Sequence, residues 1–191
     1  MTQLFRVFPY RAAAKTGEPG GALYVPPQGG GRIDNPDVYS VLYLSDSAPG
    51  AIAEAFGRFP EWTASVLEGA PGLSRSSRVL ARYRMENTGA VAPVCNLDDP
   101  KQLLSLRLRP SDVVSRDYAR TRLWARRIYE KRRWTGIRWW SYYEPSWSSF
   151  GLWNLHHLGL EQVIPLTLDH PALLEASRAI VRRVIPAHSF R

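Results

Sequence analysis

The most constraining feature of this sequence is a glycine-rich turn that runs directly into a strand and then a helix. It occupies residues 29–59, GGGRIDNPDVYSVLYLSDSAPGAIAEAFGRF. Apolar residues alternate over 38–45, as they do in a strand with two different faces. Ser47 can then cap a helix that has Pro49 near its first turn. The segment therefore predicts a loop, a strand and a short helix that pack on one another.

Three chemically distinct side chains recur through this segment at steps of eleven residues: Arg32 in the loop, Tyr43 in the strand and Glu54 in the helix. An arginine holds a diphosphate through paired charge-assisted hydrogen bonds. A tyrosine ring stacks on a planar base, and its hydroxyl bonds to a phosphate or ribose oxygen. A carboxylate beside a ribose favours positive charge at the anomeric carbon. Together they suit a ligand that contains phosphate and ribose.

Each of these residues also has a purely structural interpretation. Arg32 could be an exposed arginine of the turn, and Tyr43 could pack the sheet against the helix. Glu54 points away from the buried stripe of its helix and lies four residues before Arg58, so the two could form an exposed ion pair. Both interpretations remain open for each residue on spacing alone.

Two further positions are candidate ligand contacts. Ser141 stands among aromatic residues in GIRWWSYYEP and could orient a nucleotide by hydrogen bonding. It has no evident His–Asp partners, so a triad nucleophile is not expected, and a serine on the polar face of a strand is the alternative. Arg6 lies in an opening strand over 4–10 and could be a second phosphate ligand or face solvent.

Bulk composition narrows the class of protein. The 191 residues predict one domain over 1–191, with 45% hydrophobic residues to form its core. The single cysteine, Cys95, cannot form an internal disulfide and lies in an apolar stretch typical of a buried strand. No membrane-spanning run, signal peptide or metal-ligand spacing is evident, so the expected location is the cytoplasm and no metal is expected.

The net charge of +8 predicts attraction to anions. The region Arg116–Arg138 holds eight arginines and Lys131 against only Asp117 and Glu130. With its tryptophans it could bind nucleic acid as a basic module, by charge and stacking. A solvated helix face is the more usual explanation of such a run, so nucleic acid is not the expected partner.

The remaining pattern favours an α+β fold with a mostly antiparallel or split sheet, because strands and helices mix without strict alternation. Neither a G-x-G-x-x-G turn nor a Walker loop is present. QVIPLTL, with Pro165 inside it, is typical of an edge strand. Further strands are expected over 78–86, 90–97, 136–143 and 150–154, and helices over 100–106, 112–132 and 171–184.

Taken together, these stretches resemble the RES domain family. The resemblance covers residues 4–165 and rests on FRVF, GGGRIDNPDVYSVLYLSDSAPGAIAE, GIRWWS and FGLWN, with WARRIYE before GIRWWS. The family consists mostly of toxins of bacterial RES–Xre toxin–antitoxin pairs, with a fold similar to that of ADP-ribosyltransferases. The resemblance therefore implies a single RES-like domain, an Xre-type antitoxin as partner and a split, mostly antiparallel sheet with flanking helices.

The family's arginine, glutamate and serine match Arg32, Glu54 and Ser141, its strand tyrosine matches Tyr43, and its N-terminal arginine matches Arg6. The resemblance implies that NAD is the substrate and that the nicotinamide–ribose bond is cleaved. Water or inorganic phosphate would be the second substrate, as in an NAD glycohydrolase or phosphorylase. Transfer of ADP-ribose to a protein is the alternative, and a homo-oligomer is possible.

Two positions depart from the family pattern. Ile33 stands where the family often has tryptophan, and Tyr142 stands where it often has arginine. The second change would remove an anion contact, so it bears on substrate choice and activity.

Overall fold

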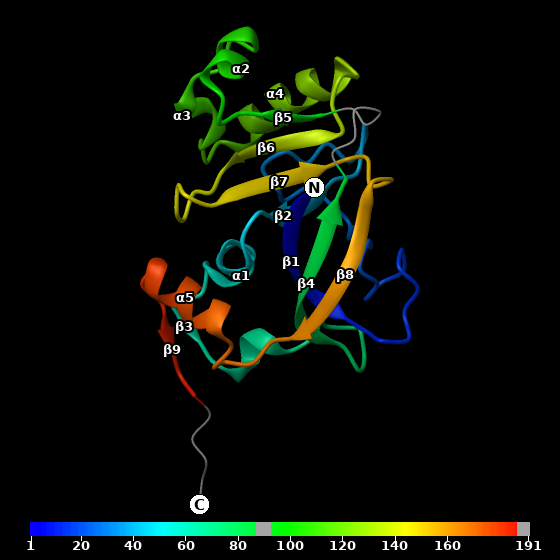
Figure 1. The fold of residues 1–191 in the computed structure, drawn as a ribbon, viewed down its shortest axis with the longest axis vertical. Coiled ribbons are helices and arrows are strands. Elements are labelled where there is room, and N and C mark those ends of the chain that lie inside the picture. The colour runs from blue at the N-terminus through cyan, green and yellow to red at the C-terminus, as the bar shows by residue number, and fades with distance from the viewer. Residues whose placement is uncertain (87–92, 187–191) are drawn as a thin grey trace, which may run out of the picture.

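A computed structural model describes residues 1–86 and 93–186 (Figure 1). The strands are β1 (Thr2–Tyr10), β2 (Leu42–Ser45), β3 (Glu61–Trp62), β4 (Ser77–Met85), β5 (Val94–Asn96), β6 (Gly136–Trp140), β7 (Ser148–Leu152), β8 (Leu158–Pro165) and β9 (Arg183–Val184). The helices are α1 (Ala48–Phe56), α2 (Pro100–Ser105), α3 (Pro110–Val113), α4 (Tyr118–Glu130) and α5 (Pro171–Ala179), with a 3₁₀ helix over Ala64–Leu67.

Within the described residues, seven strands form one sheet in the order β5-β6-β7-β2-β1-β4-β8. Every pair in it is antiparallel except β5–β6. β1 and β4 pair along their whole length, whereas β1 and β2 share the single register Phe5↔Ser45. The sheet therefore opens between β1 and β2, and Figure 1 shows that β6 and β7 run at a large angle to β1, β4 and β8. The predicted α+β fold with a split, mostly antiparallel sheet is confirmed.

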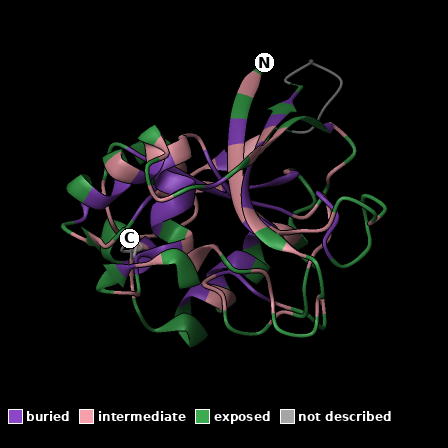
Figure 2. Cartoon of the chain, turned by 90° about the horizontal axis from the view of Figure 1, so that it is seen from below, coloured by how far each residue is buried: buried purple, intermediate pink, exposed green. Residues whose placement is uncertain are grey.

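Helices α2–α4 lie beside one half of the sheet and α1 and α5 beside the other (Figure 1), and the buried residues lie mostly in the interior of the molecule (Figure 2). α1 packs against β1 and β4, and α5 packs against α1, in a cluster that includes Ile52, Trp62 and Leu173, each fully buried. α4 packs against β5 and β6 through Ile128 and Ile137. Burying such side chains stabilises the fold by about 1.5–3 kcal/mol each. The helix that carries Glu54 is thus held by tertiary packing.

The expected helix over 112–132 is wrong, because the chain breaks into α3 and α4. Asp117 caps α4 by accepting a hydrogen bond from Arg120 N at 3.2 Å, and Ser115 Oγ accepts one from Asp117 N at 3.1 Å. These local side-chain bonds compete with the helical ladder and end it between the two helices. The break places the carbonyls of 113–115 beside the glycine loop.

The expected helix over 171–184 is also too long. α5 ends at Ala179, Val181 adopts a left-handed φ of 53°, and Arg182 N bonds back to Ser177 O at 2.7 Å. This closure is typical of a helix C-terminus. The chain then continues as β9, parallel to β3.

Other elements agree with the sequence within a few residues. Ser47 caps α1 by accepting from Gly50 N at 3.0 Å, and β8 is an edge strand that ends at Pro165. β2 covers only the second half of the expected strand 38–45, and β5 covers 94–96, while 90–92 lie outside the described residues.

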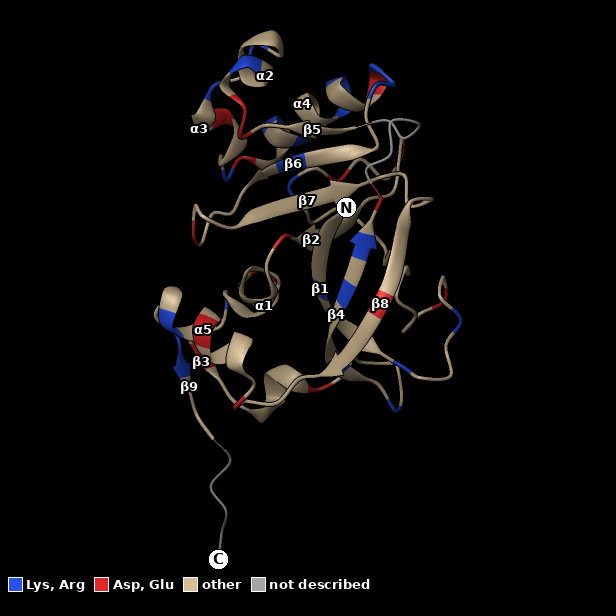
Figure 3. Cartoon of the chain, in the orientation of Figure 1, with Lys and Arg blue, Asp and Glu red and all other residues tan. Residues whose placement is uncertain are grey.

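No helix in the described part of the chain is long and apolar enough to cross a membrane. Positive residues lie on β4, α4 and β9 rather than on α4 alone (Figure 3).

Candidate functional site

A cavity of about 320 Å³ lies where the sheet opens between β1 and β2. Its walls come from both strands, the glycine loop, α1, the start of α4, and the strands β6 and β7. Four of the five residues predicted from the sequence line it: Arg6, Arg32, Tyr43 and Glu54. The fifth, Ser141, is buried just after β6 and contacts Glu54. The structure therefore places all five residues in or beside the wall of one cavity.

Glu54 projects from α1 on the side opposite its buried residues and receives two hydroxyl hydrogen bonds. Ser141 Oγ donates to Glu54 Oε1 at 2.8 Å, and Ser149 Oγ donates to the same oxygen at 3.2 Å. Both serines are buried. Because both donors use Oε1, the contacts among the described residues leave Oε2 available to a ligand. Arg58 lies over the Phe59 ring, and the contacts of Glu54 among the described residues are with the two serines and not with Arg58.

The environment of Glu54 raises the pKa of its carboxyl above the ordinary value of 4.5. The main cause is loss of hydration among the surrounding protein atoms. The hydrogen bonds from Ser141 and Ser149 and the positive charge of Arg32 act in the opposite direction. The side chain still meets water through the open cavity, so the shift is smaller than complete burial would produce.

Tyr43 fixes the loop that carries Arg32. Its hydroxyl donates to Asp34 Oδ1 at 2.6 Å and accepts from Ile33 N at 3.1 Å. Asp34 Oδ2 in turn accepts from Gly29 N at 2.8 Å and from Gly31 N at 2.6 Å. Burial and the Asp34 carboxylate raise the pKa of Tyr43, so it stays a neutral phenol. Tyr43 thus presents its ring to the cavity while its hydroxyl anchors the glycine loop.

The break between α3 and α4 holds Arg32. Arg32 Nη1 donates to Val113 O at 2.8 Å and to Ser115 O at 2.6 Å. Carbonyls at a helix C-terminus have no partner within the helix, so they accept from side chains readily. The guanidinium carbon lies 5.5 Å from the centre of the Tyr118 ring, which also lines the cavity. Neutral groups therefore position Arg32, and its charge remains available to an anion.

Arg6 reaches the cavity from β1 but has internal partners. Its Nη1 donates to Ala22 O at 3.2 Å, and its guanidinium lies 5.0 Å from the centre of the Phe8 ring. Burial lowers the pKa of Arg6, although an arginine stays protonated in a protein. Arg6 therefore contributes positive charge in a fixed position.

Arg122 connects α4 to the glycine loop. Its Nε donates to Gly31 O at 3.1 Å, and its Nη2 donates to Gly29 O. Part of the basic run thus supports the loop that carries Arg32, a role that the spacing of charges did not indicate.

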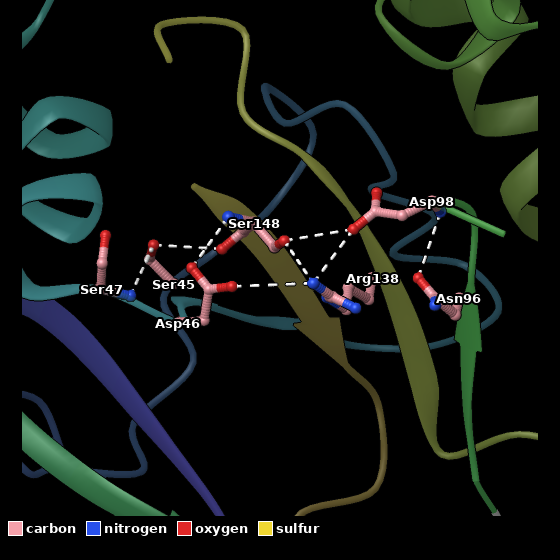
Figure 4. Close-up of polar contacts among 7 residues, drawn as sticks. All are labelled: Ser45, Asp46, Ser47, Asn96, Asp98, Arg138 and Ser148. Atoms are coloured by element: carbon pink, nitrogen blue, oxygen red, sulfur yellow. Dashed lines mark hydrogen bonds and ion pairs between the residues drawn. The ribbon is translucent and has the colours of Figure 1, made fainter. Parts of the chain in front are cut away.

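Arg138 anchors the start of α1 from β6 (Figure 4). Its Nη2 lies 3.2 Å from Asp98 Oδ2, 3.8 Å from Asp46 Oδ2 and 2.9 Å from Ser148 Oγ. Asp46 Oδ1 also accepts from Ser148 N at 2.8 Å, and Asp46 immediately precedes the Ser47 cap. This network fixes the turn from which α1 carries Glu54 into the cavity.

The two departures from the family pattern have different surroundings. Ile33 is fully buried and packs where Gly151 leaves room, so it belongs to the core. Tyr142 lines the cavity with 53% of its surface exposed. Arg116 contacts the Tyr142 hydroxyl and lies 4.8 Å from its ring centre, so a guanidinium lies beside this tyrosine.

Two further features of the described residues concern metal ligands and the single thiol. They contain no cluster of three His, Cys, Asp or Glu side chains that could hold a metal ion. Cys95 is fully buried, and burial raises the pKa of its thiol to about 12, which suppresses the reactive thiolate.

Comparison with known proteins identifies the family of this chain. The model of the RES domain matches residues 3–174. The chain belongs to the RES domain family. Among solved structures, this RES protein is similar in fold to a chain of the M. tuberculosis MbcT–MbcA toxin–antitoxin complex. The TM-score is 0.60 at 16% sequence identity, over 94% of this chain and 89% of that chain. No curated protein matches it.

Proposed function

We propose that this RES protein is a toxin-type enzyme that cleaves the nicotinamide–ribose bond of NAD. The observation that carries the proposal is the meeting of Arg32, Tyr43 and Glu54 in one cavity at the opening of the sheet. Arg32 would bind the diphosphate of the dinucleotide, Tyr43 would pack on its nicotinamide, and Glu54 would contact its ribose. Membership of the RES family supports the same reaction.

Glu54 would act on the reacting sugar. When the bond breaks, its electron pair goes to the pyridinium nitrogen, and nicotinamide leaves as a neutral molecule. Positive charge then develops at the ribose anomeric carbon, where an ionised Glu54 stabilises it. The oxygen Oε2, which is free of donors among the described residues, is the one placed to meet the ribose. Because the leaving group needs no proton, one carboxylate is sufficient.

The remaining residues would bind and orient NAD. Arg32 and Arg6 hold the diphosphate, and Tyr43 packs against the nicotinamide end. Ser141 acts through Glu54, since its hydroxyl donates to that carboxylate, and Ser149 shares this positioning role. Water or inorganic phosphate then attacks the anomeric carbon and gives ADP-ribose or its 1″-phosphate.

A protein partner follows from the same proposal. The solved structure of similar fold belongs to a toxin–antitoxin complex. We infer that an Xre-type antitoxin neutralises this protein in the cytoplasm. Co-expression with the product of an adjacent reading frame tests this: a true antitoxin restores growth and co-purifies with the enzyme.

The reaction is tested by incubating the purified protein with NAD, with and without phosphate, and separating the products. Nicotinamide with ADP-ribose indicates hydrolysis, and nicotinamide with ADP-ribose 1″-phosphate indicates phosphorolysis. Label from NAD on a protein indicates ADP-ribosyl transfer, the alternative reaction. Intact NAD under every condition contradicts the proposal.

Nucleic-acid binding by Arg116–Arg138 is a second candidate function. The structure engages several of these arginines internally: Arg120 with Asp112, and Arg126 with Glu130, in addition to the contacts of Arg122 and Arg138. The charge left on the surface favours a solvated face. A salt-dependent gel shift that is lost when Arg126, Arg127, Arg132 and Arg133 become alanine would support this function instead.

A further inference from the structure

A second hollow lies next to the cavity and shares Tyr142 with it. It has a volume of about 600 Å³ and lies between the end of α1, the end of α5 and the residues that follow Ser141. The half-exposed ring of Tyr142 forms part of both walls. A group bound in this hollow would therefore lie beside a ligand in the cavity.

Three arginines line the hollow, and neutral groups hold each of them. Arg116 contacts the hydroxyl and ring of Tyr142. The Arg58 guanidinium lies 4.6 Å from the centre of the Phe59 ring. Arg182 donates to Gly57 O through Nη2 at 2.8 Å and through Nε at 3.0 Å, so the end of α1 fixes it.

Among the residues that the structure describes, no carboxylate pairs with these three arginines, unlike several arginines elsewhere in the molecule. Arg126 pairs with Glu130, and Arg82 and Arg84 both contact Glu161. The residues that line the hollow include no Asp or Glu. Several guanidinium groups around one depression raise the local concentration of anions, and their fork geometry matches phosphate oxygens.

We propose that Arg58 and Arg116 form a phosphate-binding site beside the cavity. Arg182 adds positive charge, and Tyr143 and Ile180 form an uncharged wall. The bound group is either free inorganic phosphate or a phosphate on the ribose 2′-hydroxyl of a dinucleotide in the cavity. Both present negatively charged phosphate oxygens to the guanidinium groups. The role of the site in the reaction rests on the proposed function, whereas the binding of phosphate does not.

Calorimetric titration with inorganic phosphate at low ionic strength, without a dinucleotide, tests the binding. The folded wild-type protein is expected to bind saturably, and the double variant Arg58→Ala/Arg116→Ala is expected to bind about tenfold more weakly or worse. Arg127→Ala, a change at an exposed arginine of α4, is the matched control and keeps wild-type affinity. Arg32→Ala tests whether phosphate binds in the main cavity instead. If phosphate binds at Arg58 and Arg116, the Arg32→Ala variant keeps the wild-type affinity for phosphate.

The double variant Arg58→Gln/Arg116→Gln removes both charges but keeps long polar side chains, and it replaces the alanine pair if that pair does not fold. Absence of saturable binding to the wild type, or equal affinity in the wild type and the folded double variant, overturns the proposal.

Two kinetic comparisons identify the source of the phosphate. If free phosphate occupies the site, it accelerates NAD consumption by the wild type, and the double variant loses this acceleration. If a 2′-phosphate occupies it, NADP competes with inorganic phosphate, and the double variant loses turnover of NADP more than of NAD. A protein that leaves NAD intact but binds phosphate through these arginines would refute the proposed function and retain the site.

Discussion

The hydroxyl of Tyr43 lies 2.6 Å from the carboxylate of Asp34, and that carboxylate also accepts the backbone amides of Gly29 and Gly31. One partly buried phenol and one buried carboxylate thus fix the loop that delivers Arg32. The strand tyrosine therefore has two roles, as a wall of the cavity and as the anchor of the loop. This relationship predicts which changes in the glycine loop the protein tolerates.

Gly31→Ala is expected to abolish most activity, whereas Gly30→Ala is expected to have little effect. A methyl group on Gly31 would lie 2.6 Å from Asp34 Oδ1 and closer still to the Tyr43 hydroxyl, while one on Gly30 meets nothing within 4 Å. Neither glycine has a positive φ, so space alone separates the two variants. Rates of NAD cleavage by the two folded variants test this, and equal rates would show that the loop geometry is unimportant.

Tyr43→Phe is expected to lower the free energy of unfolding by about 1–3 kcal/mol, because it removes a hydrogen bond to a buried carboxylate and leaves the Ile33 amide unpaired. Tyr142→Phe, at an exposed ring, should change it by about 0.5 kcal/mol or less. Urea denaturation of both variants measures the difference. A Tyr43→Phe protein as stable as the wild type would contradict the anchoring role.

The activity is expected to fall at acidic pH with a midpoint above 4.5, the ordinary pKa of glutamate, because the reaction needs ionised Glu54 and its pKa is raised. Ser141→Ala and Ser149→Ala each remove a hydrogen bond that lowers this pKa, so both should move the midpoint to higher pH. Ser146→Ala, at an exposed serine between β6 and β7, should leave it unchanged. The pH dependence of kcat for the four proteins checks the assignment, and coincident profiles would refute it.

The same shift predicts an effect on stability. Since folding raises the pKa of Glu54, its contribution to stability is complete below the pKa of the unfolded chain and is lost as the pH rises through the folded pKa. Glu54→Gln should therefore be at least as stable as the wild type at pH 7, although inactive. Thermal unfolding at pH 4 and pH 7 measures this, and a variant that is destabilised only at pH 7 would contradict the sign.

Cys95 is expected to resist alkylation in the folded protein. Burial raises the pKa of its thiol from 9.0 to about 12, and the side chain is inaccessible. Iodoacetamide labelling at pH 8, followed by mass spectrometry, should label it only after denaturation. Labelling of the native protein at the rate seen in urea would show that β5 opens readily.

The sequence predicted the local part of the site, because Arg32, Tyr43 and Glu54 lie on one continuous loop, strand and helix whose signals are strong. It could not predict Ser149, which is 95 residues from Glu54 and has no motif of its own. Nor could it predict the carbonyls that hold Arg32, because they lie 81 and 83 residues away at a helix break. Such contacts depend on strand order and register, which local patterns do not determine.

The basic run illustrates the same limit. Spacing indicated a charged helix face, but Arg122 supports the glycine loop and Arg138 bridges Asp46 and Asp98. The number of charged residues is known from the sequence, but which of them form contacts within the protein depends on how α4 and β6 pack.

The most direct test of the account is release of nicotinamide from NAD by purified protein freed of any antitoxin, measured beside folded Arg32→Ala and Glu54→Ala variants. The account predicts steady release by the wild type and a loss of about 10²-fold or more in each variant. NAD left intact by the wild type, with phosphate present and absent, or full activity in the folded Glu54→Ala variant, would contradict it.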